Sequence, residues 1–119
     1  MTIDWNQQVT AAQHQAAADL RARNELKTER QAQTKAIRVT TVMGNVFQGD
    51  EVSQSRMANV LAAYAEELPD GTVDWILADN TVATVTMAEL EEALRLSVDA
   101  QNAIWQNFAN LTNATRLED

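Results

Sequence analysis

The chain has 119 residues, of which 45% are hydrophobic and none is cysteine. This length fits one domain with a modest core, and the missing cysteines exclude disulfides and thiolate metal sites. The net charge of -8 argues against nucleic acid as a partner, because phosphate attraction needs a basic surface. No apolar run approaches the roughly 20 residues of a membrane span. Residues 1–6 lack the features of a signal peptide, so we expect synthesis in the cytoplasm and no membrane partner.

The charge is spread unevenly along the chain. Residues 21–38 hold six basic and two acidic side chains, whereas residues 39–119 hold three basic and thirteen acidic ones. One interpretation is a solvated surface that keeps the protein soluble. The other is electrostatic steering, in which the basic segment of one subunit finds the acidic body of another.

Residues 4–33 are predicted to form one helix, because they contain no Gly or Pro and are rich in good helix formers. Large apolar residues are too few for a strong amphipathic stripe or a long coiled coil. We therefore expect residues 1–35 to be an arm that packs on a partner or another subunit. Its predicted contacts are Trp5, Val9, Ala12, Ala16 and Leu20, with Arg23 meeting acidic groups. The alternative is that this helix folds back onto its own sheet or last helix.

Residues 36–119 are predicted to form the body, beginning with a ββα unit. A β-rich segment at 36–42 is followed by a turn at 43–45 and a short strand at 46–48. Asp50 is placed to cap a helix that runs to about Leu68. The apolar stripe of this helix is predicted to comprise Met57, Val60, Leu61, Tyr64 and Leu68. Turn residues at 69–71 then end it.

A second ββα unit follows. Strands are predicted at 72–77 and 81–85, with a short loop at 78–80. Thr86 and Glu89 match a reciprocal capping box for a helix from Met87 to about Asn113. Trp75 is expected to anchor the core. The predicted fold is thus α+β: a helical arm, then ββαββα, with a four-stranded antiparallel sheet and two helices on one face.

The sequence offers little for catalysis. His14 stands alone on an Ala- and Gln-rich helix, so no metal site and no serine–histidine pair is expected. Asp50 and Glu51 are better explained as a helix cap and dipole partners than as a catalytic pair. We expect no enzyme activity, no cofactor and no metal. Trp105, near the end of the chain, is a candidate interface residue.

Two stretches, residues 44–57 and 75–81, carry a resemblance to a known family. The pattern resembles a small domain that recurs in tail-fibre and tail-fibre-assembly proteins of tailed bacteriophages and prophages. The resemblance covers residues 37–108 and rests on Gly44, Phe47, Asp50, Glu51, Ser53, Gln54, Arg56, Met57, Trp75, Ala78, Asp79, Asn80, Thr81, Thr86, Glu89, Leu90 and Trp105. The family brings no established activity with it.

The resemblance implies a structural component of the virion tail, made in the host cytoplasm. It would be a homo-oligomer that docks other tail or tail-fibre proteins through its N-terminal helix. One alternative is a tail-fibre assembly chaperone that is absent from the mature particle. Another, from the acidic body alone, is a host-directed inhibitor that mimics nucleic acid.

Overall fold

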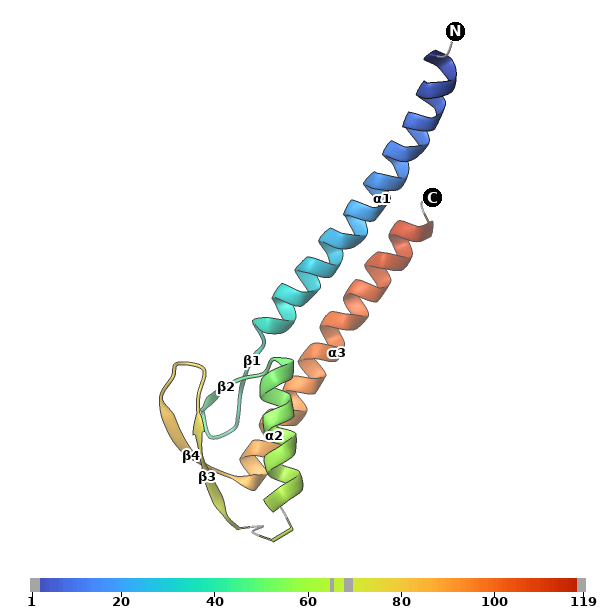
Figure 1. The fold of residues 1–119 in the computed structure, drawn as a ribbon. Helices are drawn as coiled ribbons and strands as arrows, with labels where there is room; N and C mark the ends of the chain where they lie inside the picture. Colours follow the sequence, from blue (N-terminus) through green and yellow to red (C-terminus); the bar gives the residue numbers. More distant parts are fainter. Residues whose placement is uncertain (1–2, 65, 68–69, 118–119) are drawn as a thin grey trace.

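The protein is described by a computed structural model that covers residues 3–64, 66–67 and 70–117, with side chains from residue 11 to residue 114 within those ranges. Figure 1 shows an elongated molecule, whose extents are 80 × 25 × 24 Å. A body of two hairpins and one short helix lies at one end. Two long helices extend from it and form the rest of the length.

The first helix, α1 (Ile3–Lys35), begins one residue earlier and ends two residues later than predicted. Its last turn is tightened where the Ala36 N–H donates to the carbonyls of Ala32 and Gln33, at 3.1 and 3.2 Å. The helix stops where the sequence changes to alternating buried residues at Ile37 and Val39. Their β-branched side chains favour extended backbone.

The first hairpin pairs β1 (Arg38–Thr40) with β2 (Val46–Gln48) in antiparallel register, with Val39 opposite Phe47. Both of these side chains are buried while their strand neighbours are exposed. Gly44 has a φ of 90° in the connecting turn, a backbone conformation that only glycine adopts at no steric cost. The strand predicted over residues 36–42 is shorter than expected because this turn starts at Thr41.

The second helix, α2 (Glu51–Tyr64), begins directly after Asp50. In the predicted cap the Asp50 carboxylate accepts from a helix N–H, whereas the bond that the structure shows to this carboxylate comes from the Ser53 hydroxyl. The Asp50 carbonyl accepts from the Gln54 N–H at 2.9 Å. Within the predicted stripe, Met57 is buried and Tyr64 is 45% exposed. The helix ends at Tyr64, before the predicted end, and Leu68 lies outside the described residues.

The second hairpin pairs β3 (Thr72–Ile76) with β4 (Val82–Thr86) and sets Trp75 opposite Ala83. Each strand lies within one residue of its predicted bounds. Asn80 closes the turn with a positive φ of 68°, which Asn tolerates better than most residues. The Leu77 N–H donates to the Thr81 carbonyl at 2.8 Å and secures the same turn.

The predicted four-stranded sheet is wrong. In the described part of the chain the strands form two separate two-stranded antiparallel sheets, β1–β2 and β3–β4. A backbone hydrogen bond joins them, from the Ala78 N–H to the Val46 carbonyl at 3.0 Å. Three-residue strands offer few pairing groups, and two-stranded ribbons twist more strongly than wide sheets. The two hairpins are therefore joined by this backbone hydrogen bond and do not align into one four-stranded sheet.

The third helix, α3 (Met87–Leu117), contacts α1, α2, β1 and β4 and is the central element of the molecule. At its start the Glu89 N–H donates to the Thr86 hydroxyl at 3.1 Å, which confirms half of the capping box. The Glu89 side chain does not serve the cap. It is buried and accepts from the Thr41 hydroxyl and the Asn45 amide, each at 2.8 Å. It thereby ties the first hairpin to α3.

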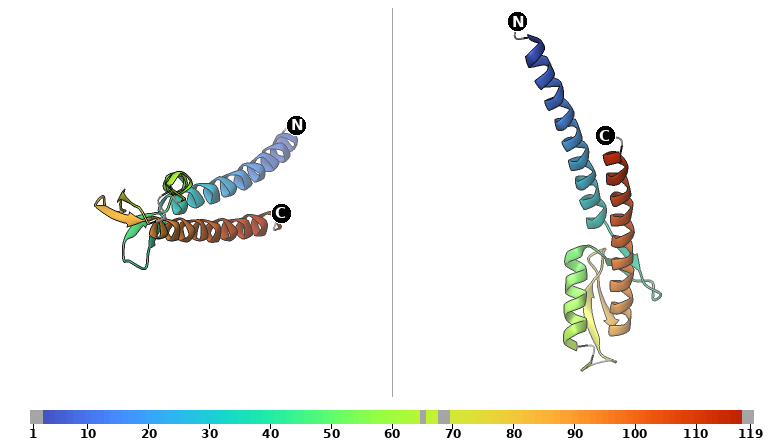
Figure 2. Two further views of the ribbon diagram at one scale, coloured as in Figure 1. Left: turned by 90° about the horizontal axis from the view of Figure 1, so that it is seen from below. Right: turned by 90° about the vertical axis from the view of Figure 1, so that its right-hand side faces the viewer.

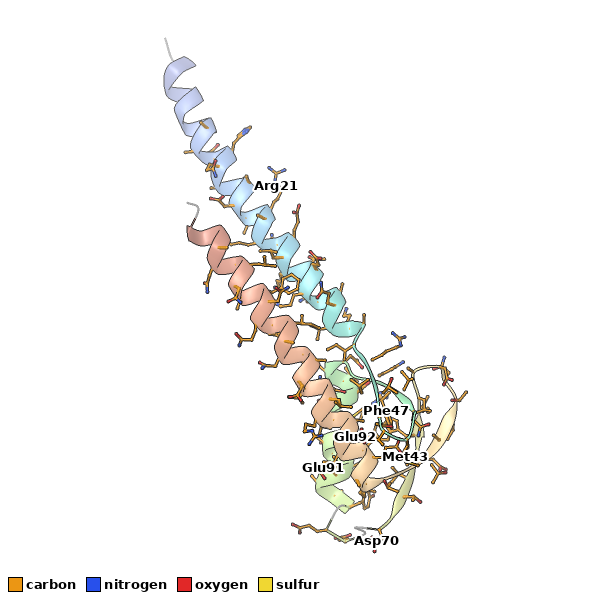
Figure 3. All side chains as sticks on the ribbon, turned by 180° about the vertical axis from the view of Figure 1, so that it is seen from behind. Arg21, Met43, Phe47, Asp70, Glu91 and Glu92 are labelled. Carbon is orange, nitrogen blue, oxygen red and sulfur yellow. The ribbon has the colours of Figure 1, made fainter. Side chains whose placement is uncertain are left out.

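The core cluster contains Phe47, the largest of the fully buried side chains, which Figure 3 labels within the body. The other members of the cluster are Ile37, Val39, Met57, Leu77, Val85, Leu90 and Ala93. Trp75 is only partly buried and packs against this cluster from one side. The expectation that Trp75 anchors the core is therefore corrected: the largest fully buried side chain is Phe47.

Candidate interaction surface

The C-terminal half of α1 packs along α3 to form a two-helix stalk, which both views of Figure 2 show. On α1 the side chains of Ala22, Leu26, Arg30 and Thr34 are less exposed than most of their neighbours. Their four-residue spacing puts them on one helix face. Phe108 on α3 is 3% exposed although it lies outside the main core cluster. We infer that α1 covers it, so this half of α1 folds back onto the last helix.

The N-terminal half of α1 has no such cover. It projects beyond the end of α3 (Figure 1), and every side chain from residue 11 to residue 18 is exposed. We call the described part of this segment, residues 3–21, the arm. Arg21 at its base points into solvent (Figure 3). Isolated helices are marginal in water, so this segment has the properties of a helix that gains stability from another surface.

The predicted interface residues lie along this helix but are not gathered into one patch. Ala12, Ala16 and Arg23 are exposed, and Leu20 is 57% exposed. Trp5 and Val9 belong to α1, but their side chains lie outside the described ones. The structure therefore places four of the predicted contacts on an accessible helix surface.

Trp105, the other predicted interface residue, lies on α3 at the base of the stalk. Its ring is 43% exposed, and the guanidinium carbon of Arg30 stands 4.2 Å from the ring centroid. Such a cation–π contact is attractive because the face of the indole ring is electron-rich. Trp105 thus joins α1 to α3 within the chain and presents less than half of its surface to a partner.

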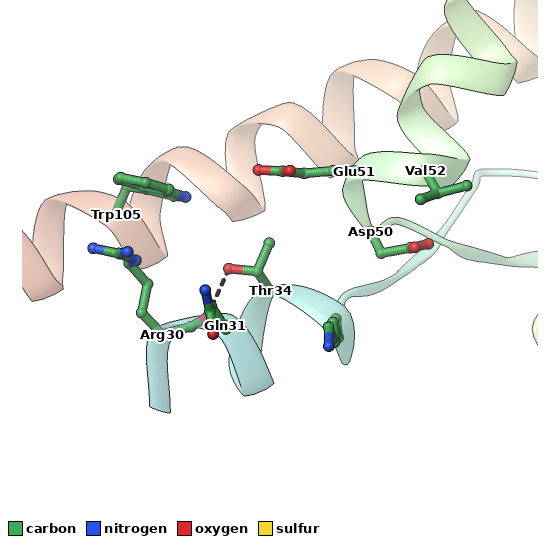
Figure 4. Close-up of a pocket in the computed structure, with 8 residues that line it drawn as sticks. Arg30, Gln31, Thr34, Asp50, Glu51, Val52 and Trp105 are labelled. Carbon is green, nitrogen blue, oxygen red and sulfur yellow. Dashed lines mark hydrogen bonds between the residues drawn. The ribbon is translucent and has the colours of Figure 1, made fainter. Parts of the chain in front are cut away.

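A cavity of about 550 Å³ lies beside Trp105, where the end of α1, the start of α2 and α3 meet (Figure 4). It is lined by Arg30, Gln31, Thr34, Lys35, Asp50, Glu51, Val52 and Trp105. The carboxylates are already engaged: Glu51 accepts from the Gln101 amide at 2.9 Å, and Asp50 accepts from Ser53. Two basic and two acidic side chains balance, so the cavity has no formal charge that would select an ionic ligand.

The tip of the first hairpin is a feature that the sequence reasoning missed. Val42 is 91% exposed and Met43 is 76% exposed. The tip is held in place because the Val42 N–H donates to the Glu92 carboxylate at 2.9 Å, and Figure 3 places Met43 close to Glu92. In the sequence, the signal for this exposed tip is the pair of apolar residues Val42 and Met43 directly before Gly44. The β-rich pattern over residues 36–42 predicted a longer strand instead.

No group of three or more metal-ligating side chains comes together among the described residues. His14 is exposed on the arm. The hydroxyls of Ser53 and Ser97 are used for structure, since they donate to the Asp50 carboxylate and the Ala93 carbonyl.

None of the helices, within the residues that the structure covers, combines the length and the apolar character needed to cross a bilayer.

Fold and surface together define a small α+β protein with a two-helix stalk and an exposed helical arm. The chain belongs to the family described as Domain of unknown function (DUF4376), whose model matches residues 13–119. The match includes α1 from Gln13 onward, so it extends well beyond the 37–108 region of the sequence resemblance. The curated proteins gave no match, and neither did the solved structures.

Proposed function

We propose that this protein is a non-enzymatic structural component of a bacteriophage or prophage tail, which docks to other tail or tail-fibre proteins through its N-terminal helix. The setting is supported by the resemblance of residues 37–108 to a domain of tail-fibre and tail-fibre-assembly proteins. The docking role is supported by the structure of the arm. The protein would be made in the host cytoplasm and end in the virion.

The observation that carries the docking role is the exposure of the arm. Residues 11–18 extend past the end of α3 with every side chain accessible. Their composition, five alanines among eight residues, permits close approach of a partner helix, because small side chains let two backbones come near each other. Leu20 at the base of the arm and Arg23 just beyond it then supply an apolar and a charged contact.

A non-enzymatic role fits the use of the polar groups that could otherwise react. Ser53, Ser97 and Glu89 are committed to internal hydrogen bonds that hold helix ends and the first hairpin. The cavity at the three-helix junction is lined by side chains whose carboxylates are already paired. Binding to another protein is the activity that remains for the accessible surfaces.

The test is mass spectrometry of purified particles from a phage that encodes this chain. A structural component is expected at a fixed ratio to the other tail proteins. Deleting residues 1–18 is expected to leave the body folded, since the covered positions of α1 start at Ala22, and to prevent incorporation into the particle. A matched control is Asn24→Asp with Thr28→Glu, which changes the exposed side of α1 nearer the body.

Absence of the wild-type chain from infectious particles that nevertheless need it for assembly would overturn the structural role and favour the assembly chaperone. Incorporation of the truncated chain at the wild-type ratio would show that the arm is not the docking element.

A further inference from the structure

The exposed sides of α1 differ in charge over the part of the helix that packs on α3. The covered positions there are Ala22, Leu26, Arg30 and Thr34. Successive helix residues lie about 100° apart around the axis, so the residue after each covered position falls on one flank of the stalk and the residue before it on the other. The first of these flanks carries Arg23, Lys27, Gln31 and Lys35, all exposed. We call these four residues the basic flank.

The basic flank differs from the other exposed sides of the helix. It holds three cations and no carboxylate, over a rise of roughly 18 Å from Arg23 to Lys35. The opposite flank holds one cation and two carboxylates, and its residues are Arg21, Glu25, Glu29 and Gln33. The outermost side, between the two flanks, has no charge and consists of Asn24, Thr28 and Ala32. A chain with a net charge of -8 thus presents an unmixed row of cations on one side of its stalk.

The basic flank leads into the cavity of about 550 Å³ at the base of the stalk, because Gln31 and Lys35 also line that cavity (Figure 4). The apolar part of the lining is accessible: Val52 is 60% exposed and Trp105 is 43% exposed. The charges of the cavity balance and its carboxylates already accept hydrogen bonds, so it favours an uncharged group. A row of cations and an accessible apolar cavity therefore form one continuous surface.

We propose that the basic flank and this cavity together bind an acidic helical segment of a partner protein, which places a large apolar side chain in the cavity. Residues four apart share one face of a helix. Carboxylates at that spacing on a helix alongside α1 would therefore meet Arg23 and Lys27. Charged residues beside a helix pair select the partner in this way in coiled coils. The half-exposed indole of Trp105 is a typical anchor for an apolar side chain.

The charge complementarity is local to the stalk. Charges farther apart than about 10 Å are largely screened at 0.1 M salt, so the distant acidic groups of the body have little influence on a segment bound along α1. The basic flank ends beside Asp50 and Glu51. These carboxylates would repel a phosphate backbone that continued past Lys35, whereas a protein segment can present an uncharged side chain at that point. The surface therefore suits an acidic protein better than a nucleic acid.

This inference deepens the proposed function, on which it rests in taking α1 as the docking helix. It adds the chemistry of the partner: an acidic helix with an apolar residue at one end. It also divides the work along α1, because the arm offers small side chains and the basic flank offers charge. The basic flank lies outside residues 1–18, so the truncated chain keeps this surface.

The experiment measures binding of labelled synthetic peptides to the purified full chain by fluorescence anisotropy. The acidic peptide is an alanine-based helix with Glu at every fourth position and one Phe near an end. The basic peptide has Lys in place of each Glu, and a third peptide keeps Glu but has Ala in place of Phe. The wild type is expected to bind the acidic peptide about ten-fold more tightly than the basic one, since several modest ion pairs add. The peptide without Phe is expected to bind several-fold more weakly than the acidic peptide.

Variants of the chain locate the binding surface. Arg23→Gln with Lys27→Gln is expected to weaken binding of the acidic peptide several-fold. The matched control, Asn24→Asp with Thr28→Glu, lowers the net charge equally on the outermost side and is expected to bind nearly as the wild type does. Arg23→Glu with Lys27→Glu is expected to prefer the basic peptide. Val52→Asp should remove the advantage that Phe confers. Circular dichroism checks that all variants keep their helix content.

Four outcomes would overturn the proposal. The first is a wild type that binds the acidic peptide no better than the basic one, or binds neither. The second is a loss in the outermost-side control as large as in the variant of the basic flank. The third is a peptide without Phe that binds as tightly as the acidic peptide. The fourth is a DNA duplex that binds as tightly, because the surface would then recognise negative charge alone. None of these outcomes bears on incorporation into phage particles, so failure here is distinguishable from failure of the proposed function.

Discussion

Arg30 lies over the indole ring of Trp105, with 4.2 Å between its guanidinium carbon and the ring centroid. The contact joins α1 to α3 at the base of the stalk, one turn before the end of α1 (Figure 4). It therefore contributes to the packing of the two helices against each other.

Replacing Arg30 with Ala is expected to loosen the stalk while the body stays folded. A partly exposed cation–π contact contributes on the order of 0.5–1 kcal/mol, and the Arg30 stem also covers apolar surface. Hydrogen exchange of the α1 amides between residues 22 and 35 should become several-fold faster. Lys27→Ala, on an exposed position of the same helix, is the control. If the α1 amides are equally protected from hydrogen exchange in Arg30→Ala and Lys27→Ala, the contact between Arg30 and Trp105 has no special role.

The core makes a second prediction, a contrast between two aromatic residues. Phe47 is fully buried, whereas Trp75 is partly exposed at the edge of the cluster. Phe47→Ala should cost about 3–5 kcal/mol through lost burial and a cavity, and Trp75→Ala should cost less. Urea unfolding of both variants measures the difference. A larger loss for Trp75→Ala would place the centre of the core at the second hairpin instead.

Sequence periodicity predicted every helix and strand in the right order, because helix caps and turn residues act locally. Thr86, whose hydroxyl accepts from the Glu89 N–H at the start of α3, is an example. Sequence periodicity could not predict how the two hairpins contact each other. The way in which the two hairpins meet depends on strand twist and on the bond from the Ala78 N–H to the Val46 carbonyl, and neither leaves a trace in the pattern of apolar residues.

The candidate surface was predicted in part. The absence of large apolar residues in the arm indicated an exposed helix, and residues 11–18 are exposed. The packing of Arg30 on Trp105 was missed, because a contact between residues so far apart in the chain depends on the path of the whole stalk. The partners of Glu89 were missed for the same reason: Thr41 and Asn45 come from the first hairpin.

Gly49 provides the third prediction. A Cβ atom at this position would lie 2.6 Å from Ile37 Cγ2 and 2.6 Å from Ser97 Oγ, so even a methyl group has no room. Gly49→Ala is expected to destabilise the protein by roughly 1–3 kcal/mol through overpacking, measured by thermal melting. Adding Ser97→Ala removes one of the clashing atoms and should recover part of the loss. If the free-energy changes of Gly49→Ala and Ser97→Ala simply add in the double variant, the clash with Ser97 is not the cause of the destabilisation.

The fourth prediction concerns the turn of the second hairpin, where Asp79 is bonded to Thr81. The Asp79 carboxylate accepts from the Thr81 hydroxyl at 2.6 Å and from the Thr81 N–H at 3.0 Å. These two bonds lower the pKa of Asp79 below its ordinary value of 3.8, and the bond from the Thr81 hydroxyl has the larger effect. Because the pKa of Asp79 is lower in the folded state than in the unfolded chain, the ionised carboxylate stabilises the fold at pH values above the ordinary pKa of 3.8. That stabilisation is lost as the pH falls through the folded pKa.

Asp79→Ala should therefore lower the melting temperature at neutral pH by a small amount, since the turn is fully exposed and solvent screens it. The difference from the wild type should shrink as the pH falls well below 3.8, because the wild-type carboxyl is then protonated as well. Asp70→Ala, which removes the same charge just before β3, is the control for net charge. A difference between Asp79→Ala and the wild type that stays constant from neutral to acid pH would show that the bonds to Thr81 do not depend on the ionised carboxylate.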